Sequence, residues 1–224
     1  MSFDGRGATP DLFADPHFSP VGSERLGEQA WLLRGWAREF AAELYASVQA
    51  LLAQAPLRQM LTPGGQRMAV ATSSCGALGW TSSAAGYRYL PRDPDSGRPW
   101  PAMPALLAEL AARAAREAGF AGFAPDTCLI NRYLPGVRLS LHQDRDEQDL
   151  TQPIVSLSLG LPAVFLLGGA TRAERQRPVL LEHGDALVWG GVDRLRFHGV
   201  RPLKAGWHPL LGEQRINLTF RKAR

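Results

Sequence analysis

Hydrophobic and polar positions change their spacing about halfway along the chain. In the first half, residues 36–53 and 104–118 carry alanine and leucine at the three- and four-residue intervals of an amphipathic helix. Pro56 closes the first segment, whereas the second starts with Pro104 near its first turn and stops at Gly119. These patterns predict two helices in the first half of the chain.

From Thr127 onward the pattern changes to short strands. Seven segments alternate polar and apolar residues or form short apolar runs, with Pro, Gly and Asp turns between them: "TCLINRY", "VRLSLH", "PIVSLSLGL", "AVFLLGG", "PVLLEHGDALVWGG", "RLRFHGV" and "RINLTFR". Strands at such close spacing favour a β-sandwich or an open barrel with helices packed on one side. The expected fold class is therefore mostly β with flanking helices.

The segment between the two predicted helices, residues 57–101, follows neither pattern. It is rich in Gly, Ser, Pro, Trp and Tyr, which makes it too polar and broken for a core element and too aromatic for a linker. Long irregular segments of this kind often serve as lids or binding surfaces. We expect residues 57–101 to form a lid within a single domain that runs from residue 11 to 224, after a flexible tail of residues 1–10.

Composition narrows the class of partner. The formal charge is +4 with a pI near 9.5, and Lys204 and Lys222 are the only lysines among 25 basic residues. A mild, arginine-based excess of positive charge suits a polyanionic partner without requiring one. The two cysteines, Cys75 and Cys128, lie far apart without a CxxC pattern, as expected for reduced thiols in a cytoplasmic protein. No apolar run approaches the ~20 residues of a membrane span, so we expect no membrane partner. We also expect a monomer.

The sequence "LSLHQDRDE" carries the first candidate chemistry. Side chains alternate faces in an extended chain, so His142, Asp144 and Asp146 would point to one side. Two histidines and one carboxylate with open positions are the ligand set of non-haem Fe(II) oxygenases. The histidine and the nearer aspartate could supply two of these three ligands, although spacing alone also fits an ordinary polar strand end.

Three histidines could complete such a site once His17 in the tail is set aside. His183 lies in a tight turn, where a solvent-facing position is expected, and His208 precedes a proline in a loop. His198 lies in a predicted strand, and the glycine that follows it permits close approach by another group.

The segment "RINLTFR" places polar residues on one face of a predicted strand. Arg215, Asn217, Thr219 and Arg221 alternate with three apolar residues. Such a face could be a solvated sheet edge. Because arginine grips carboxylates with two parallel hydrogen bonds, the two arginines could instead bracket a dicarboxylate.

At the level of whole blocks the chain resembles the bacterial AlkB proteins, which are Fe(II)- and 2-oxoglutarate-dependent nucleic acid dealkylases. The blocks that carry the resemblance are "DLFADP", "LRQMLTPGG", "CGALGWT", "PWPAMP", "LINRYLPG", "LSLHQDRDE", "SLSLGLPAVF", "LEHGDALVWGG", "PLKAGWHPL" and "INLTFR". They extend from Asp11 to Arg221. The HxD…H set alone would indicate only the wider oxygenase superfamily, and the lid and C-terminal blocks narrow it. Gln66 departs from the family, which has an aromatic residue at this place in the TPGG loop.

This resemblance implies a double-stranded β-helix, the jelly-roll barrel of that superfamily. Its iron would be held by His142, Asp144 and His198. In the 2-oxoglutarate site, Arg215 would grip the distal carboxylate with help from the Tyr133 hydroxyl. The residues implied at the metal-bound end and in the pocket wall are Arg221, Asn131 and Asn217.

The resemblance also assigns roles in the lid and around the mouth of the site. Trp80 would stack on an extruded base, and Tyr87 and Tyr89 would contact that base or its neighbouring phosphate. Packing against the barrel is the alternative for these aromatic residues. Arg172, in a basic loop between strands, would lie near the nucleic acid. From the residues themselves we expect Asp146, left over from the metal site, to accept a hydrogen bond from the exocyclic amine of a cationic methylated base, although it could instead simply end a strand beside Arg145 and Glu147.

The function implied is oxidative demethylation of 1-methyladenine and 3-methylcytosine in single- or double-stranded DNA, with RNA as a second candidate. Fe(II), 2-oxoglutarate and O2 are the cofactors and co-substrates of this reaction, and formaldehyde is released. One alternative is an oxygenase of the same fold that acts on a protein or a small molecule. Another is a binding module that keeps the barrel without catalysis.

Overall fold

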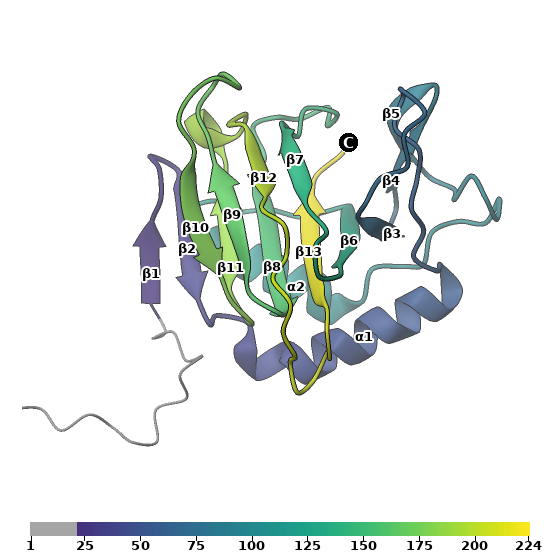
Figure 1. The fold of residues 1–224 in the computed structure, drawn as a ribbon, viewed down its shortest axis with the longest axis horizontal. Helices are drawn as coiled ribbons and strands as arrows, with labels where there is room; N and C mark the ends of the chain where they lie inside the picture. The colour runs from purple at the N-terminus through teal and green to yellow at the C-terminus, as the bar shows by residue number, and fades with distance from the viewer. Residues whose placement is uncertain (1–21) are drawn as a thin grey trace, which may run out of the picture.

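The computed structural model describes residues 22–224, so the expected tail and His17 lie outside the described residues. Its core is a pair of antiparallel sheets that face each other (Figure 1). The larger sheet has seven strands in the order β1 (Gly22–Arg25), β2 (Ala30–Arg34), β11 (Ala186–Trp189), β8 (Ile154–Gly160), β13 (Arg215–Arg221), β6 (Thr127–Tyr133) and β3 (Ala71–Gly76). The smaller sheet has the order β10 (Arg177–Leu181), β9 (Ala163–Leu167), β12 (His198–Val200) and β7 (Leu139–His142). This is the jelly-roll barrel that the resemblance to the AlkB proteins implies.

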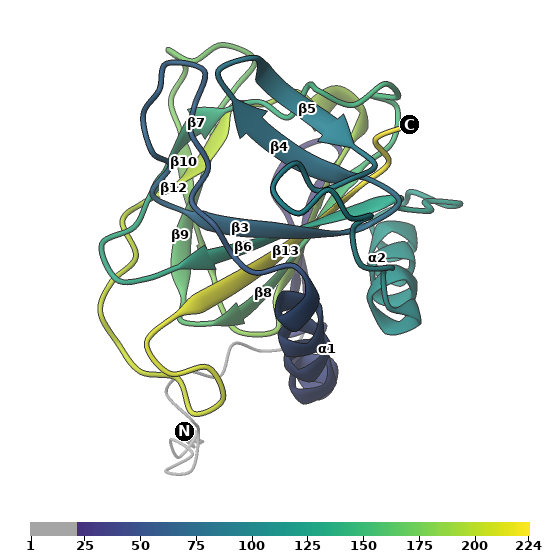
Figure 2. The same cartoon turned by 90° about the vertical axis from the view of Figure 1, so that its right-hand side faces the viewer.

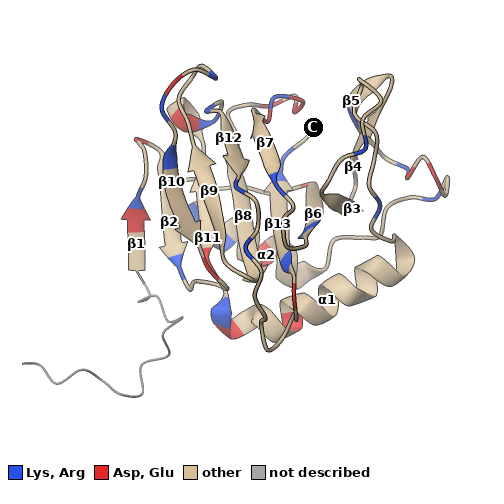
Figure 3. Cartoon of the chain, viewed as in Figure 1, with Lys and Arg blue, Asp and Glu red and all other residues tan. Residues whose placement is uncertain are grey.

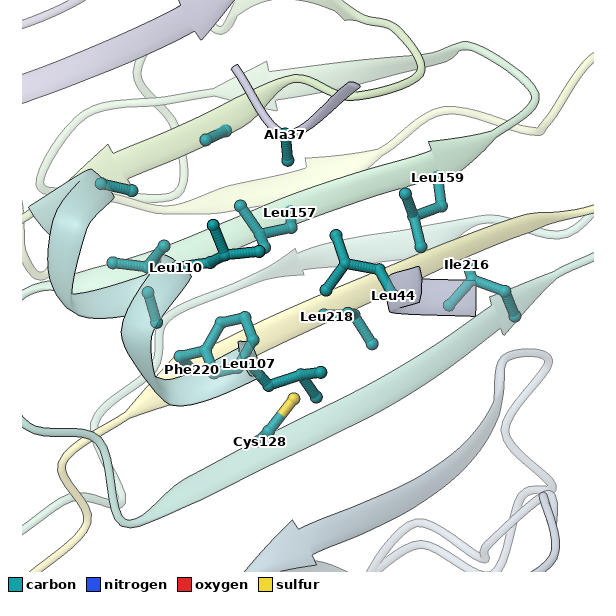
Figure 4. Packing of buried hydrophobic residues seen from close by; sticks show 14 of the residues in the cluster. Ala37, Leu44, Leu107, Leu110, Cys128, Leu157, Leu159, Ile216, Leu218 and Phe220 are labelled. Atoms are coloured by element: carbon teal, nitrogen blue, oxygen red, sulfur yellow. The ribbon is translucent and has the colours of Figure 1, made fainter. Parts of the chain in front are cut away.

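Two helices cover the outer face of the larger sheet, and both were predicted. Helix α1 (Ala41–Gln54) follows the short 3-10 helix η1 (Arg38–Phe40), and α2 is Ala105–Glu117. Their apolar faces meet the sheet in one cluster, where Leu44, Leu107 and Leu110 pack against residues of β8 and β13 (Figure 4). This layer fixes which face of each strand points away from the helices and toward the interior of the barrel.

The alternation read from the sequence holds in the central strands. In β13, the three apolar residues belong to the helix-side cluster, whereas the polar residues face the space between the sheets. Strands β6, β7, β8, β9 and β11 also lie in the segments predicted for them, and β10 begins one residue earlier than its segment. Strand β12 (His198–Val200) is shorter than the predicted segment 194–200: after the 3-10 helix η2 (Gly191–Asp193), residues 194–195 form a turn, and pairing begins only at His198.

The prediction that residues 57–101 contain no core element was wrong. Strand β3 is buried and pairs with β6 along its whole length, because its small side chains fit between the sheet and the layers beside it. The pattern also missed β1 and β2, which precede the first helix. The rest of the lid does stand apart: β4 (Gly79–Ser83) and β5 (Gly86–Leu90) form a separate two-stranded hairpin beside the barrel (Figure 2). Within residues 22–224, no helix has the length and apolar character needed to cross a membrane.

Candidate active site

The two predicted metal-binding segments meet because they lie on neighbouring strands. His142 ends β7, His198 begins β12, and the two residues are direct partners in the antiparallel ladder. Gly199 allows this close pairing, since a Cβ there would lie 2.8 Å from the Leu139 carbonyl oxygen. Asp144 follows β7 by two residues and completes the group, whose candidate ligand atoms all lie within 4.8 Å of one another.

The geometry of the three side chains suits a divalent metal. His142 Nε2 lies 3.7 Å from Asp144 Oδ1, and His198 Nε2 lies 3.6 Å from Asp144 Oδ2. Each histidine turns its Nδ1 toward a backbone carbonyl oxygen, of Ser140 at 3.0 Å and of Arg196 at 2.9 Å. A carbonyl oxygen only accepts, so the proton sits on Nδ1 and Nε2 offers its lone pair to a metal.

The charge states also fit. Burial, together with the neighbouring His198, lowers the pKa of His142 to about 4, so this imidazole is neutral at physiological pH. Burial alone would raise the pKa of Asp144, but the Arg221 guanidinium holds it well below its usual range. Two imidazoles and one carboxylate form the donor set of non-haem Fe(II) oxygenases.

The other two described histidines lie elsewhere. His183 Nδ1 accepts a hydrogen bond of 3.0 Å from the Gly160 N–H, and its ring lies 4.2 Å from that of His208, centroid to centroid. Gly160 ends β8, whereas the candidate metal ligands lie at β7, β12 and just after β7. His183 is therefore half-buried in a second histidine pair, not solvent-facing as its turn position suggested.

The polar face of β13 is buried, which excludes the solvated-edge reading. Strand β13 lies between β6 and β8, and Arg215 is only 2% exposed. Arg215 is the direct partner of Tyr133, and Asn217 is the direct partner of Asn131. Four of the residues expected at the 2-oxoglutarate site thus form two neighbouring cross-strand pairs.

Both arginines keep buried donors that an anion could satisfy. Arg215 donates from Nη2 to Ser158 Oγ at 3.0 Å, but its Nε and Nη1 have no hydrogen-bond partner among the described residues. Arg221 donates from Nη2 to Asp144 Oδ2 at 2.8 Å, and its Nη1 likewise lacks a partner in residues 22–224. Unsatisfied buried donors are costly, and a carboxylate offers the matching acceptors. The site therefore fits a dicarboxylate beside the metal.

Comparison with known proteins agrees with this geometry. The model of the 2OG-Fe(II) oxygenase superfamily matches residues 29–221. The alpha-ketoglutarate-dependent dioxygenase AlkB of Salmonella typhimurium is 54% identical over 95% of this chain and 97% of its own length. The AlkB of Escherichia coli is 53% identical over the same shares. The chain belongs to the AlkB family of Fe(II)- and 2-oxoglutarate-dependent dioxygenases.

More distant AlkB-family relatives extend the comparison. The solved structure of OsALKBH1 superposes with a TM-score of 0.80 at 26% identity, and the match covers 90% of this chain and 100% of that one. Matches over 44% of the chain include the DNA N(6)-methyladenine demethylase ALKBH1D of Arabidopsis thaliana, at 44% identity and over 25% of its length. They also include the tRNA demethylase abh1 of Schizosaccharomyces pombe, at 32% identity and over 37% of its length.

In this AlkB-family barrel the lid hairpin brings its aromatic side chains to the metal-binding loop. The Trp80 and Tyr87 rings stack at 5.4 Å with planes inclined by 17°. Trp80 Nε1 donates to Asp146 Oδ2 at 3.3 Å, which places the leftover carboxylate beside the lid. Tyr87 is 45% exposed and open to a ligand.

Tyr89 differs from the expectation of a direct substrate contact. Its side chain is buried, and its hydroxyl donates to Glu147 Oε1 at 2.6 Å. Arg172 is exposed, donates to the Leu141 carbonyl oxygen and lies over the Phe197 ring at 4.9 Å. Its guanidinium is therefore held one residue away from the candidate metal ligand His142.

Sequence reasoning missed two charged residues behind the site, Glu147 and Arg194. The Glu147 carboxylate is buried and accepts from Arg194 Nη2 at 3.0 Å. Arg194 also donates from Nη1 to the Asp144 carbonyl oxygen at 2.6 Å. The run of carboxylates in "HQDRDE" could have indicated Glu147, but strand alternation predicts that its side chain points away from the site. Arg194 lies in a segment read as a strand.

Proposed function

We propose that this dioxygenase removes methyl groups from base nitrogens of nucleic acids, with 1-methyladenine and 3-methylcytosine in DNA as the leading substrates. The observation that carries the proposal is the position of Asp146, two residues beyond the candidate iron ligand Asp144 and hydrogen-bonded to the ring of Trp80 in the lid. An aromatic face and a carboxylate at the mouth of an oxidising centre suit a flat, cationic substrate.

The lid residues account for how such a base would be held. An extruded base can stack on the Trp80–Tyr87 pair, because every base offers a π-face. Methylation at N1 of adenine or N3 of cytosine makes the base cationic at neutral pH and leaves an exocyclic amine beside the lesion. The Asp146 carboxylate can accept a hydrogen bond from that amine and favours the cationic lesion over the neutral base.

The barrel residues account for the rest of the reaction. When bound, iron and 2-oxoglutarate would allow O2 to act as the oxidant: one oxygen atom would enter succinate as 2-oxoglutarate loses carbon dioxide, and the other would convert the N-methyl group to a hydroxymethyl group that leaves as formaldehyde. His142, Asp144 and His198 would hold the metal. Arg215 and Arg221 would neutralise the two carboxylates of the co-substrate and fix its orientation.

The distribution of charge supports a polyanionic substrate. Figure 3 shows basic positions on the lid segments beside β4 and β5 and on the loops at the same end of the barrel, with acidic positions between them. Arg172, exposed and anchored beside β7, is the residue we propose as a phosphate contact. The names of the relatives, demethylases of DNA and of tRNA, agree with a nucleic acid substrate.

The proposal is tested by measuring formaldehyde and succinate together. A single-stranded DNA oligonucleotide with one 1-methyladenine should yield the two products in nearly equal amounts, whereas the unmethylated oligonucleotide should yield no formaldehyde. A panel of DNA and RNA, single- and double-stranded, then ranks the substrates. Consumption of 2-oxoglutarate without formaldehyde from any methylated oligonucleotide would instead favour an oxygenase that acts on a protein or a small molecule.

A further inference from the structure

The lid hairpin touches the metal-binding loop at two consecutive carboxylates. Trp80 and Tyr89 are direct cross-strand partners in the hairpin, and the first donates to Asp146 at 3.3 Å while the second donates to Glu147 at 2.6 Å. Burial, reinforced by the Glu147 carboxylate, raises the pKa of Tyr89, so its hydroxyl stays protonated and remains a donor. The shorter contact, from Tyr89 to Glu147, is buried, whereas the contact from Trp80 to Asp146 is exposed.

Glu147 also belongs to a buried chain of alternating charges that ends at a metal ligand. Its carboxylate lies 3.0 Å from Arg194 Nη2 and 3.3 Å from Arg221 Nε. Arg221 in turn donates to Asp144 Oδ2 at 2.8 Å. All four side chains are mostly buried, with exposures between 1% and 11%. Charges this close in a buried setting constrain one another's positions strongly.

We propose that Glu147 is a positioning residue that couples the lid hairpin to the iron and 2-oxoglutarate site. The inference rests on the proposed function, because coupling matters only if the lid holds the substrate. The hairpin forms a separate sheet, and the buried Tyr89 hydroxyl links it to the Glu147 carboxylate. Arg221 contacts both this carboxylate and that of Asp144. A base seated against Trp80 would replace the exposed contact to Asp146, and the Tyr89–Glu147 bond would then keep the hairpin in register with the metal.

A structural role for Glu147 alone makes a different prediction. Arg194 and Arg221 already balance its charge, and Arg194 fixes the loop through the Asp144 and Gln152 carbonyl oxygens as well. The Tyr89 hydroxyl adds nothing to that balance. If Glu147 only stabilised the loop, removal of this one hydroxyl would leave the chemistry unchanged.

The first test uses the metal-free protein. Tyr89→Phe removes the hydroxyl and keeps the ring, so amide hydrogen exchange in residues 79–90 should become faster by on the order of tenfold, as expected when a hydrogen bond to a charged group is lost. The matched control is Tyr45→Phe. Tyr45 lies on helix α1, away from the lid, and its hydroxyl accepts a long hydrogen bond of 3.4 Å from Gln214. The control should leave exchange in the hairpin unchanged.

The second test uses the enzyme with iron and 2-oxoglutarate. With a 1-methyladenine oligonucleotide, Tyr89→Phe should bind iron normally and still form succinate, but the ratio of formaldehyde to succinate should fall at least several-fold. Glu147→Gln, which keeps the shape of the side chain, should lower the same ratio, and adding Tyr89→Phe to it should lower it no further.

Two results would overturn the inference. One is hairpin exchange in Tyr89→Phe equal to that in Tyr45→Phe, and the other is an unchanged ratio of formaldehyde to succinate. Failure of the proposed function is distinguishable, because the unsubstituted enzyme would then form succinate without formaldehyde while the exchange measurement would still report whether the hydroxyl holds the lid.

Discussion

Two aspartates at adjacent positions on one side of the chain do different work in this site. Asp144 lies between two histidine Nε2 atoms and carries a pKa held low by Arg221, whereas Asp146 faces Trp80 in the lid. Asp144→Ala should lose bound iron. Asp146→Ala should keep its iron and still decarboxylate 2-oxoglutarate at a slow rate. Its rate of demethylation should fall by about tenfold or more, because one charge-assisted hydrogen bond to the substrate is lost. Iron content and formaldehyde release measured for both variants check this, and the reverse pattern would show that the assignment is wrong.

The two histidine pairs offer a second contrast between residues. His198 is the ladder partner of His142 and lies next to Asp144, whereas His183 accepts a hydrogen bond from the Gly160 N–H and its ring packs at a tilt against that of His208. We expect His198→Ala to abolish iron-dependent succinate formation and His183→Ala to retain most of it. A His198→Ala variant with full activity would remove this histidine from the metal site.

The buried guanidinium of Arg215 gives a prediction for the co-substrate. Lysine keeps the charge but loses the planar fork, so Arg215→Lys should raise the apparent KM for 2-oxoglutarate by on the order of tenfold. Arg221→Lys should also weaken binding, with an added effect on Asp144. The exposed Arg116 on helix α2 provides the control, since Arg116→Lys should leave the titration unchanged. Equal KM values for all three variants would contradict the placement of the co-substrate.

At the scale of elements, the sequence was informative where one face of a strand is apolar and the other polar. Strand β13 shows this alternation, and its bounds match the segment read from the sequence. Strand β3 defeats the same reading, because its buried side chains are small and include Thr72, Ser73 and Ser74. Burial of a hydroxyl depends on the neighbouring strand and helix, which local alternation does not reveal.

The loop between β9 and β10 gives a prediction for nucleic acid binding. Each phosphate neutralised on a single strand contributes about −0.7 to the slope of log affinity against log salt. Arg172→Gln should therefore make the slope shallower by about 0.7, because the exposed guanidinium is anchored beside β7. Arg116→Gln, on the helix side, is the control and should leave the slope unchanged. An identical slope for both variants would assign Arg172 to another task.

At the scale of the whole molecule, a buried group that stays neutral makes the free energy of unfolding depend on pH. Burial, with His208 and Arg38 nearby, lowers the pKa of His183 from 6.5 to about 4. Between these values the unfolded chain binds more protons than the folded one, so stability should fall as the pH drops from about 6.5 to about 4. Since His183 is only half-buried, its contribution to this loss in the free energy of unfolding should be roughly 1–2 kcal/mol.

This contribution can be isolated by substitution. His183→Asn keeps an acceptor for the Gly160 N–H but does not titrate in this range, so urea unfolding should show a smaller loss of stability between pH 6.5 and 4 than in the unsubstituted protein. Equal losses in the two proteins would show that His183 titrates normally.

The site as a whole was predictable only as far as sequence neighbours and family blocks reach. The metal ligands and the polar row of β13 are local patterns that the barrel then brings together. The pairing of Glu147 with Arg194 joins positions 47 residues apart in sequence, and it depends on a turn that replaces part of a predicted strand. Such contacts form only in the folded barrel, so the pattern of either segment alone does not predict them.

The most direct test of the account is the mass of the nucleic acid after reaction. A DNA oligonucleotide with a single 1-methyladenine is incubated with the enzyme, Fe(II), 2-oxoglutarate and O2, and its mass is then measured. We expect the oligonucleotide to lose one methylene unit, which restores adenine, and to keep its mass when 2-oxoglutarate is omitted. An oligonucleotide of unchanged mass, recovered from a reaction that had formed succinate, would contradict this expectation.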